Sequence, residues 1–115
     1  MWRPALLLAV QRLEHVWLHL NDGLLWTQEA VRDREEIYNY IEEDNPLAAL
    51  ALDDLLSEGT IRLQDYPKIG RTGRVPGTLE LIVHSNYIVV YEVVQAQVRI
   101  LNVVHTARQW PQLQE

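Results

Sequence analysis

The chain of 115 residues contains no cysteine. It can therefore form neither a disulfide framework nor a thiolate metal site. A domain of this length buries roughly 60–70% of its unfolded surface and needs no such staples. The lack of cysteine fits a reducing compartment, so we expect a single domain in the cytoplasm.

Long apolar runs are also lacking. Near the N-terminus the longest, Ala5–Val10, is too short for a signal peptide, and no small-residue cleavage site follows it. The segment of residues 1–23 is too polar to span a membrane. We therefore expect no contact with a membrane.

The segment 1–23 instead has the pattern of an amphipathic helix. Pro4 suits a first helical turn, and Asn21-Asp22-Gly23 suits a C-terminal stop. The apolar stripe between them consists of Leu6, Val10, Leu13, Trp17 and Leu20. Three interpretations stay open: a helix packed on the domain, an interface helix, or an extension that the native chain lacks because translation starts near Leu24.

Lysine occurs once, at Lys68, and the formal net charge of the chain is −6. Residues 1–59 carry 4 Arg or Lys against 12 Asp or Glu, whereas residues 60–115 carry 6 against 4. A protein that binds nucleic acid broadly has an excess of positive charge, so the composition disfavours that class. The basic half holds either a solvated surface of mixed charge or a basic patch of Lys68, Arg71, Arg74, Arg99 and Arg108.

Motifs for metals and cofactors are missing as well. His15 and His19 stand four residues apart, the spacing of a zinc-binding pair, but no HExxH pattern surrounds them. The glycine-rich stretch GRTGRVPG matches neither the P-loop nor the dinucleotide fingerprint. We therefore expect no metal and no cofactor, and interpret residues 66–78 as a connecting loop.

What the sequence does contain is a long β-branched stretch near its C-terminus. Short polar interruptions divide it into three predicted strands, Leu79–His84, Tyr87–Val94 and Val98–His105. Ser85-Asn86 is predicted as a two-residue hairpin loop with Asn86 at positive φ, and Gln95–Gln97 as a looser loop. Loops this short join antiparallel neighbours, so the three strands form a meander.

Two helices are predicted before this meander. Leu24–Trp26 is an expected first strand, and Thr27 is the expected cap of the first helix. Asn45 caps the second helix, with Pro46 in its first turn. The second helix is expected to bury Ala48, Leu52, Leu55 and Leu56.

This order predicts an α+β domain over residues 24–115: a two-helix hairpin packed on a twisted antiparallel sheet, with an additional N-terminal helix at residues 1–23.

Four segments of the chain, in this order and spacing, resemble the RelE/ParE superfamily of toxins from type II toxin–antitoxin modules. They are IYNYIEEDNPLAA, YPKIGRTGRVPGT, NYIVVYEV and VRILNVVHTARQWP. The resemblance covers Leu24 to Pro111 and implies the same two-helix, antiparallel-sheet fold. The IxxYIxxDNP-like hairpin and the VLHxAR-like ending are more similar to the ParE branch.

The resemblance implies a cognate antitoxin encoded beside the toxin gene, and it leaves two targets open. ParE-like members poison DNA gyrase and have no established catalytic site. RelE-like members cut messenger RNA on the ribosome and are generally much more basic than this chain. We therefore expect a ParE-like gyrase poison, with a RelE-like endoribonuclease or an inactive interaction module as alternatives.

The resemblance also implies candidate site residues. If the chain is a ribonuclease, the expected active groups are His105, Tyr87 and Arg74. The expected target-binding residues are Lys68, Arg71, Arg74, Arg99, His105, Arg108 and Trp110. For His105 and Arg108, catalysis, a target contact and closure of the last strand all stay open.

Overall fold

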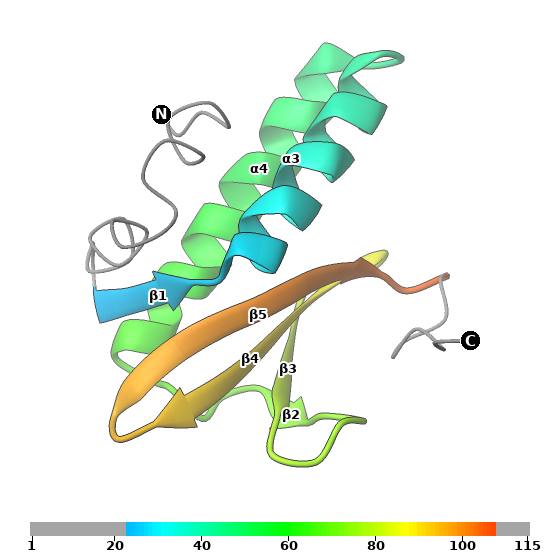
Figure 1. Cartoon of the computed structure of the whole chain (residues 1–115). Coiled ribbons are helices and arrows are strands. Elements are labelled where there is room, and N and C mark those ends of the chain that lie inside the picture. The colour runs from blue at the N-terminus through cyan, green and yellow to red at the C-terminus, as the bar shows by residue number, and fades with distance from the viewer. Residues whose placement is uncertain (1–22, 108–115) are drawn as a thin grey trace.

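The computed structural model describes residues 23–107, and it shows two helices packed on one face of a five-stranded sheet (Figure 1). The predicted helix of residues 1–23 lies outside the described residues except for Gly23. The elements in chain order are β1 (Leu24–Trp26), α3 (Gln28–Glu42), α4 (Pro46–Ile61), the short 3₁₀ helix η2 (Arg62–Gln64), β2 (Arg71–Thr72), β3 (Leu79–His84), β4 (Tyr87–Val94) and β5 (Gln97–His105).

The sheet has the strand order β1-β5-β4-β3-β2. Strands β3, β4 and β5 form the predicted antiparallel meander. The short strand β1, however, pairs in parallel with β5, from Leu24 opposite Val98 to Trp26 opposite Ile100. The helical hairpin lies between these strands in the sequence and is long enough to act as a crossover. The predicted α+β architecture is confirmed, and its sheet is mixed rather than wholly antiparallel.

Side-chain caps define where both helices begin. The hydroxyl oxygen of Thr27 accepts a hydrogen bond from the Ala30 N–H at 3.1 Å, and the same hydroxyl lies 3.0 Å from the carbonyl oxygen of Ile100 on β5. The Asn45 Oδ1 accepts from the Ala48 N–H at 3.1 Å, with Pro46 as the first helical residue. Both predicted caps are confirmed, and the first of them also ties α3 to the sheet.

The core lies between the helices and the sheet. Its central members are Ala30 on α3, Leu56 on α4, Leu63 on η2, and Val89, Tyr91 and Ile100 on the sheet. Each of these side chains is at most 1% exposed. Burial of this kind contributes roughly 25 cal/mol for each Å² of apolar surface removed from water.

The buried face of helix α4 was predicted in part, and Leu52 and Leu56 are buried as predicted. Its buried residues are Ala49, Leu52, Leu56, Gly59 and Thr60. Ala48 is exposed and Leu55 is 38% exposed, so their predicted burial is wrong. A Cβ at Gly59 would lie 2.8 Å from Cγ1 of Val83, so glycine lets α4 approach β3 closely at this point.

The two hairpin turns also differ from the prediction. Positive φ values occur at Gln95 (52°) and Ala96 (69°) in the β4–β5 turn and not at Asn86. Left-handed backbone at both central residues is the geometry of a tight hairpin turn. The β3–β4 pairing instead has an irregular register between Ile82 and His84. A bulge of that kind adds local twist to the hairpin.

A second bulge, in β5, is held by Asp33 of α3. In the pairing of β5 with β4, Val90 is opposite Asn102 and Tyr91 is opposite Ile100, so Leu101 has no partner residue. Asp33 Oδ2 accepts hydrogen bonds from the Val103 N–H and from Asn102 Nδ2, both at 3.0 Å. Burial raises the pKa of the Asp33 carboxyl, and these two hydrogen bonds lower it. The net shift is upward, so ionised Asp33 is less favourable in the folded chain than in the unfolded one.

We expect Asp33→Asn to change how stability depends on pH. An amide oxygen can still accept both hydrogen bonds, but it is never charged. The contribution of the protonated carboxyl is fully present below pH 3.8 and is lost as the pH rises through the raised pKa. The stability of the variant relative to the wild type should therefore increase from pH 4 towards pH 7. Urea unfolding across that range measures it, and a constant difference would contradict the assignment.

Candidate functional site

The basic loop between β2 and β3 is anchored by a buried carboxylate. Glu80 is 2% exposed, and its Oε1 accepts from Nε and Nη2 of Arg71 at 3.2 and 3.0 Å. Its Oε2 accepts from the backbone N–H of Arg74 at 3.0 Å. The strand β2, which the sequence did not predict, forms where Arg71 pairs with Glu80. One carboxylate therefore holds both ends of the loop's cationic stretch.

The same loop packs tightly on Tyr91. The Tyr91 hydroxyl oxygen accepts from the Gly70 N–H at 2.9 Å, and burial raises the pKa of this phenol. A Cβ at position 70 would lie 2.7 Å from that hydroxyl and 2.8 Å from the Glu80 carbonyl oxygen. The glycine thus serves a close backbone approach. Residues 66–78 are a packed connecting loop, as predicted.

The other predicted target-binding residues have different surroundings. Lys68 is exposed on the chain leading into β2. The Arg71 side chain is 50% exposed despite its ion pair with Glu80. Arg99 lies 3.8 Å from Glu92 on the neighbouring strand. Arg108 and Trp110 lie outside the described residues.

A row of three rings crosses the other end of the sheet. His84, Tyr87 and His105 are direct partners across β3, β4 and β5. The ring centroids of Tyr87 and His105 are 4.9 Å apart in an edge arrangement, and those of His84 and Tyr87 are 6.0 Å apart. We call these residues the His–Tyr–His row. Two of its members, Tyr87 and His105, were singled out from the sequence.

The third member, His84, was missed, although the sequence carries a signal for it. Each histidine is the last residue of its strand, and each Nδ1 accepts a backbone N–H from two residues further on. The donors are Asn86 at 3.0 Å and Ala107 at 2.9 Å. A histidine that ends a predicted strand just before a turn is the pattern common to both positions.

These hydrogen bonds determine what the two imidazoles offer. An Nδ1 that accepts an N–H carries no proton in the neutral ring, so the proton is on Nε2. The outward nitrogen is then a hydrogen-bond donor without a free lone pair. Neutral His84 and His105 are therefore suited to donate to an acceptor group rather than to remove a proton.

The structure does not bring all the predicted ribonuclease groups together. Arg74 is bound through its backbone to Glu80, the second residue of β3, whereas His84 is the last residue of that strand. Four residues of extended chain span about 13 Å. Tyr87 and His105 thus lie together at one end of β3, and the Arg74 backbone is anchored near the other.

The helical hairpin carries exposed apolar side chains. On α4 they include Leu47 (77% exposed), Leu50 (45%) and Ile61 (45%), and on α3 Tyr40 (77%). Leu47 and Leu50 stand three residues apart and therefore lie on one side of α4. We call these four residues the hairpin's apolar surface.

Residues 23–107 contain neither a metal-binding cluster nor a membrane-spanning helix. No group of three or more His, Asp or Glu side chains in this range is arranged to hold a metal ion. No helix among these residues is long and apolar enough to cross a membrane. The spaced pair His15 and His19 lies outside the described range.

Comparison with known proteins identifies relatives for most of the chain. The candidate toxin Y4kP of Sinorhizobium fredii is 39% identical over 89 residues, which are 76% of this chain and 92% of Y4kP. The toxin RelE2 of Caulobacter vibrioides is 35% identical over 86 residues, 74% of this chain and 96% of RelE2. A solved chain of the chromosomal ParDE toxin–antitoxin system from P. aeruginosa superposes with a TM-score of 0.63 at 25% identity, covering 70% of this chain and 90% of that one.

Fold and relatives together define the class: a small toxin of the RelE/ParE superfamily. Residues 24–110 match the family described as the ParE toxin of the type II toxin–antitoxin system parDE, and the chain belongs to that family. The resemblance predicted from the sequence is thereby confirmed. A toxin of such a module has a cognate antitoxin as its partner.

Proposed function

We propose that this chain acts as ParE-like toxins do, by poisoning DNA gyrase until its antitoxin binds it. The observation that carries the proposal is the arrangement of the candidate ribonuclease groups. The backbone of Arg74 is anchored at the opposite end of β3 from Tyr87 and His105. Cleavage of RNA needs a base or acid and a phosphate-binding cation around one bond.

The state of His105 supports the same proposal. A general base must present a free lone pair, and the Nδ1 lone pair of His105 is occupied by the Ala107 N–H. The outward Nε2–H remains able to donate to a carbonyl or carboxylate of a protein surface. A target contact is the role that this geometry favours.

The basic loop supplies a second part of the proposed contact. Because Glu80 holds Arg71 and the Arg74 backbone in place, the loop loses little conformational freedom on binding. With Lys68, Arg99, His105, Arg108 and Trp110, these arginines make up the proposed target-binding set. The net charge of −6 over the whole chain suits a protein target better than nucleic acid alone.

The antitoxin is proposed to cover the hairpin's apolar surface. Amphipathic segments bind such surfaces by laying their apolar face on them. Exposed acidic residues of α3, of α4 and of the turn between them include Glu42, Glu43, Asp44, Asp54 and Glu58. The covering segment is therefore expected to be apolar on one face and basic at its rim.

Supercoiling by purified gyrase tests the proposed target. Increasing toxin should inhibit supercoiling of relaxed plasmid, and the antitoxin should restore it. Loss of a contacting cation costs on the order of tenfold in affinity or more, so Lys68→Glu and Arg74→Glu should raise the inhibitory concentration at least about tenfold. Arg62→Glu, an exposed cation outside the proposed set, is the matched control and should change little. Unimpaired supercoiling at a large excess of wild-type toxin would rule the target out.

A RelE-like endoribonuclease is the second candidate, favoured by the edge contact of Tyr87 with His105. His105→Gln separates the two functions, because the glutamine amide keeps a donor near the Nε2 position but cannot transfer a proton. Loss of a general acid or base costs about 10²–10⁴-fold in rate. Primer extension on ribosome-bound messenger would show cuts that the variant abolishes if the chain is a ribonuclease. As a gyrase poison, the variant should keep most of its toxicity.

A further inference from the structure

The His–Tyr–His row presents two hydrogen-bond donors that no residue among 23–107 uses. His84 and His105 are both partly exposed, and the Nε2 of neither ring has a hydrogen-bond partner in that part of the chain. Because each Nδ1 accepts a backbone N–H, the proton of the neutral ring is on Nε2. Tyr87 is 8% exposed and lies between the two imidazoles. The row is therefore a pair of donors on either side of a phenol ring.

The surroundings of the row favour an uncharged ligand. Tyr87 and His105 are each two residues from a core valine of the same strand, so the row lies on the side of the sheet that faces the helices. On this side Asp33 of α3 binds the Val103 N–H, two residues before His105. Acidic residues outnumber basic ones on this helix, which carries Glu29, Asp33, Glu35, Glu36 and Glu42 against Arg32 and Arg34. The negative charge disfavours a phosphate or carboxylate, so the carbonyl oxygens of a peptide are the acceptors that fit.

The spacing of the two donors selects the conformation of that peptide. The histidines are on β3 and β5 with β4 between them, so they are two strand spacings apart, about 9.6 Å. An extended strand repeats its carbonyl groups on one side about every 6.6 Å, and an α-helix uses its carbonyl groups internally. A polyproline II helix has about three residues per turn and rises about 3.1 Å per residue, so its unbonded carbonyl groups recur on one side about every 9.3 Å. Of these repeats, the last matches the row.

We propose that the His–Tyr–His row binds a proline-rich peptide segment in the polyproline II conformation. The segment crosses the ends of β3, β4 and β5, and two of its carbonyl oxygens, three residues apart, accept from Nε2 of His84 and of His105. Proline rings between these carbonyl groups pack against the imidazoles and the exposed part of Tyr87, as prolines do on other aromatic surfaces. His84 thereby becomes a binding residue equal to His105.

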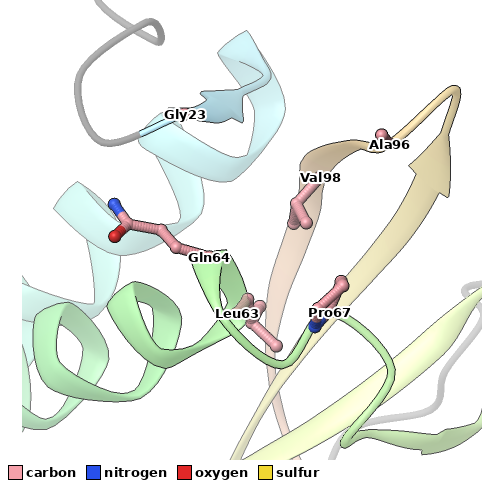
Figure 2. A pocket seen from close by; sticks show the side chains of 6 residues that line it. All are labelled: Gly23, Leu63, Gln64, Pro67, Ala96 and Val98. Atoms are coloured by element: carbon pink, nitrogen blue, oxygen red, sulfur yellow. The ribbon is translucent and has the colours of Figure 1, made fainter.

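The row is separate from an open cavity at the other end of the same strands. That cavity has a volume of about 370 Å³ and lies beside the β4–β5 turn (Figure 2). Its lining has no aromatic ring and no charged group, and consists of Gly23, Leu63, Gln64, Pro67, Ala96 and Val98. Binding at the row needs none of these residues, so a replacement in the cavity serves as a control.

Titration of the purified toxin with a proline oligomer of about ten residues tests the proposal, because such an oligomer adopts the polyproline II helix without a partner. Binding is followed by NMR through the side-chain resonances of the two histidines. A glycine–serine peptide of equal length is flexible and serves as the control ligand. The proline oligomer should shift both histidine resonances, and the flexible peptide should shift neither.

Matched replacements separate the outward donor from the turn that each histidine accepts. His84→Leu and His84→Gln both remove Nδ1, so they share any loss of turn stability, but the glutamine amide keeps an N–H near the Nε2 position. His84→Leu should weaken binding about threefold to tenfold, as expected for one lost hydrogen bond, and His84→Gln less than about twofold. The same two replacements of His105 should behave alike. Gln64→Ala, in the cavity, should leave the affinity unchanged.

Three outcomes would overturn the proposal. If His84→Leu and His84→Gln bound the proline oligomer equally well, the imidazole would not act as a donor. If the wild type bound the oligomer no better than the flexible peptide, or bound an oligoglutamate more tightly, the row would not recognise a polyproline II segment. These titrations contain no gyrase, so a failure of this proposal is distinguishable from a failure of the proposed target.

Discussion

Replacement of Arg34 by alanine is expected to destabilise the fold by about 3 kcal/mol, the lower end of the range for removing one partner of a buried ion pair. The Arg34 side chain is 9% exposed. Its Nε lies 2.6 Å from Asp53 Oδ1, and its Nη2 donates to Ser57 Oγ at 2.7 Å and to the Asp53 carbonyl at 3.2 Å. Its guanidinium carbon also lies 5.0 Å from the centre of the Trp26 ring. One side chain thus joins α3, α4 and β1.

The expected loss of stability is at the lower end of that range because the Asp53 side chain is 27% exposed and can be partly rehydrated once Arg34 is gone. Urea unfolding of matched variants measures the effect. Arg34→Lys keeps the charge but not the planar fork, so it should recover only part of the stability. Arg32→Ala, an exposed arginine on the same helix, is the control and should change stability by less than about 0.5 kcal/mol. If Arg34→Ala were as mild as Arg32→Ala, the interhelical role of Arg34 would be refuted.

Replacement of Glu80 by alanine should both destabilise the domain and disable the basic loop. The Glu80 side chain is 1% exposed and accepts three hydrogen bonds from Arg71 and the Arg74 backbone. Loss of these hydrogen bonds leaves the Arg74 N–H without its acceptor. We expect the free energy of unfolding to fall by about 2–3 kcal/mol in total. Without this anchor the loop becomes more mobile. Its cations then lose more conformational entropy when they bind the target, so the affinity falls.

Two readouts separate these effects. Urea unfolding gives the stability, and inhibition of gyrase at a temperature where the variant stays folded gives the function. Glu92→Ala is the control: Glu92 is also paired with an arginine, but at 3.8 Å and 30% exposed, so it should cost under about 1 kcal/mol. A folded Glu80→Ala variant with full inhibitory potency would show that the loop is not a target contact.

The parts of the fold that the sequence predicted are those decided by local patterns. β3 and β4 have the predicted bounds, and β5 begins one residue earlier, at Gln97. β-branched runs between turn residues define such strands without help from distant contacts. The caps at Thr27 and Asn45 are also local, because each satisfies an N–H three residues on.

The parts that were missed depend on distant contacts. Strand β2 has two residues and exists because Arg71 pairs with Glu80. The parallel pairing of β1 joins Leu24 to Val98, which is far away in the sequence, and no local pattern records it. The burial of Ala49 in place of Ala48 and the close approach of α4 to β3 at Gly59 likewise depend on packing between different elements.

The candidate site was predicted only in part for the same reason. Tyr87 and His105 were singled out, but their direct pairing and the addition of His84 follow from the strand register. The tautomer of each histidine depends on the backbone N–H that its Nδ1 accepts from the following turn. The neutralisation of Arg71 by Glu80, nine residues further along the chain, is likewise a property of the folded sheet edge.

Trapping of covalent gyrase–DNA complexes shows whether the toxin poisons gyrase. Purified toxin is added to gyrase and plasmid, and the reaction is stopped with detergent and protease. We expect linear DNA that increases with toxin, persists with His105→Gln and disappears when the antitoxin is added first. Intact plasmid at every toxin concentration, together with cuts in ribosome-bound messenger that His105→Gln abolishes, would contradict it.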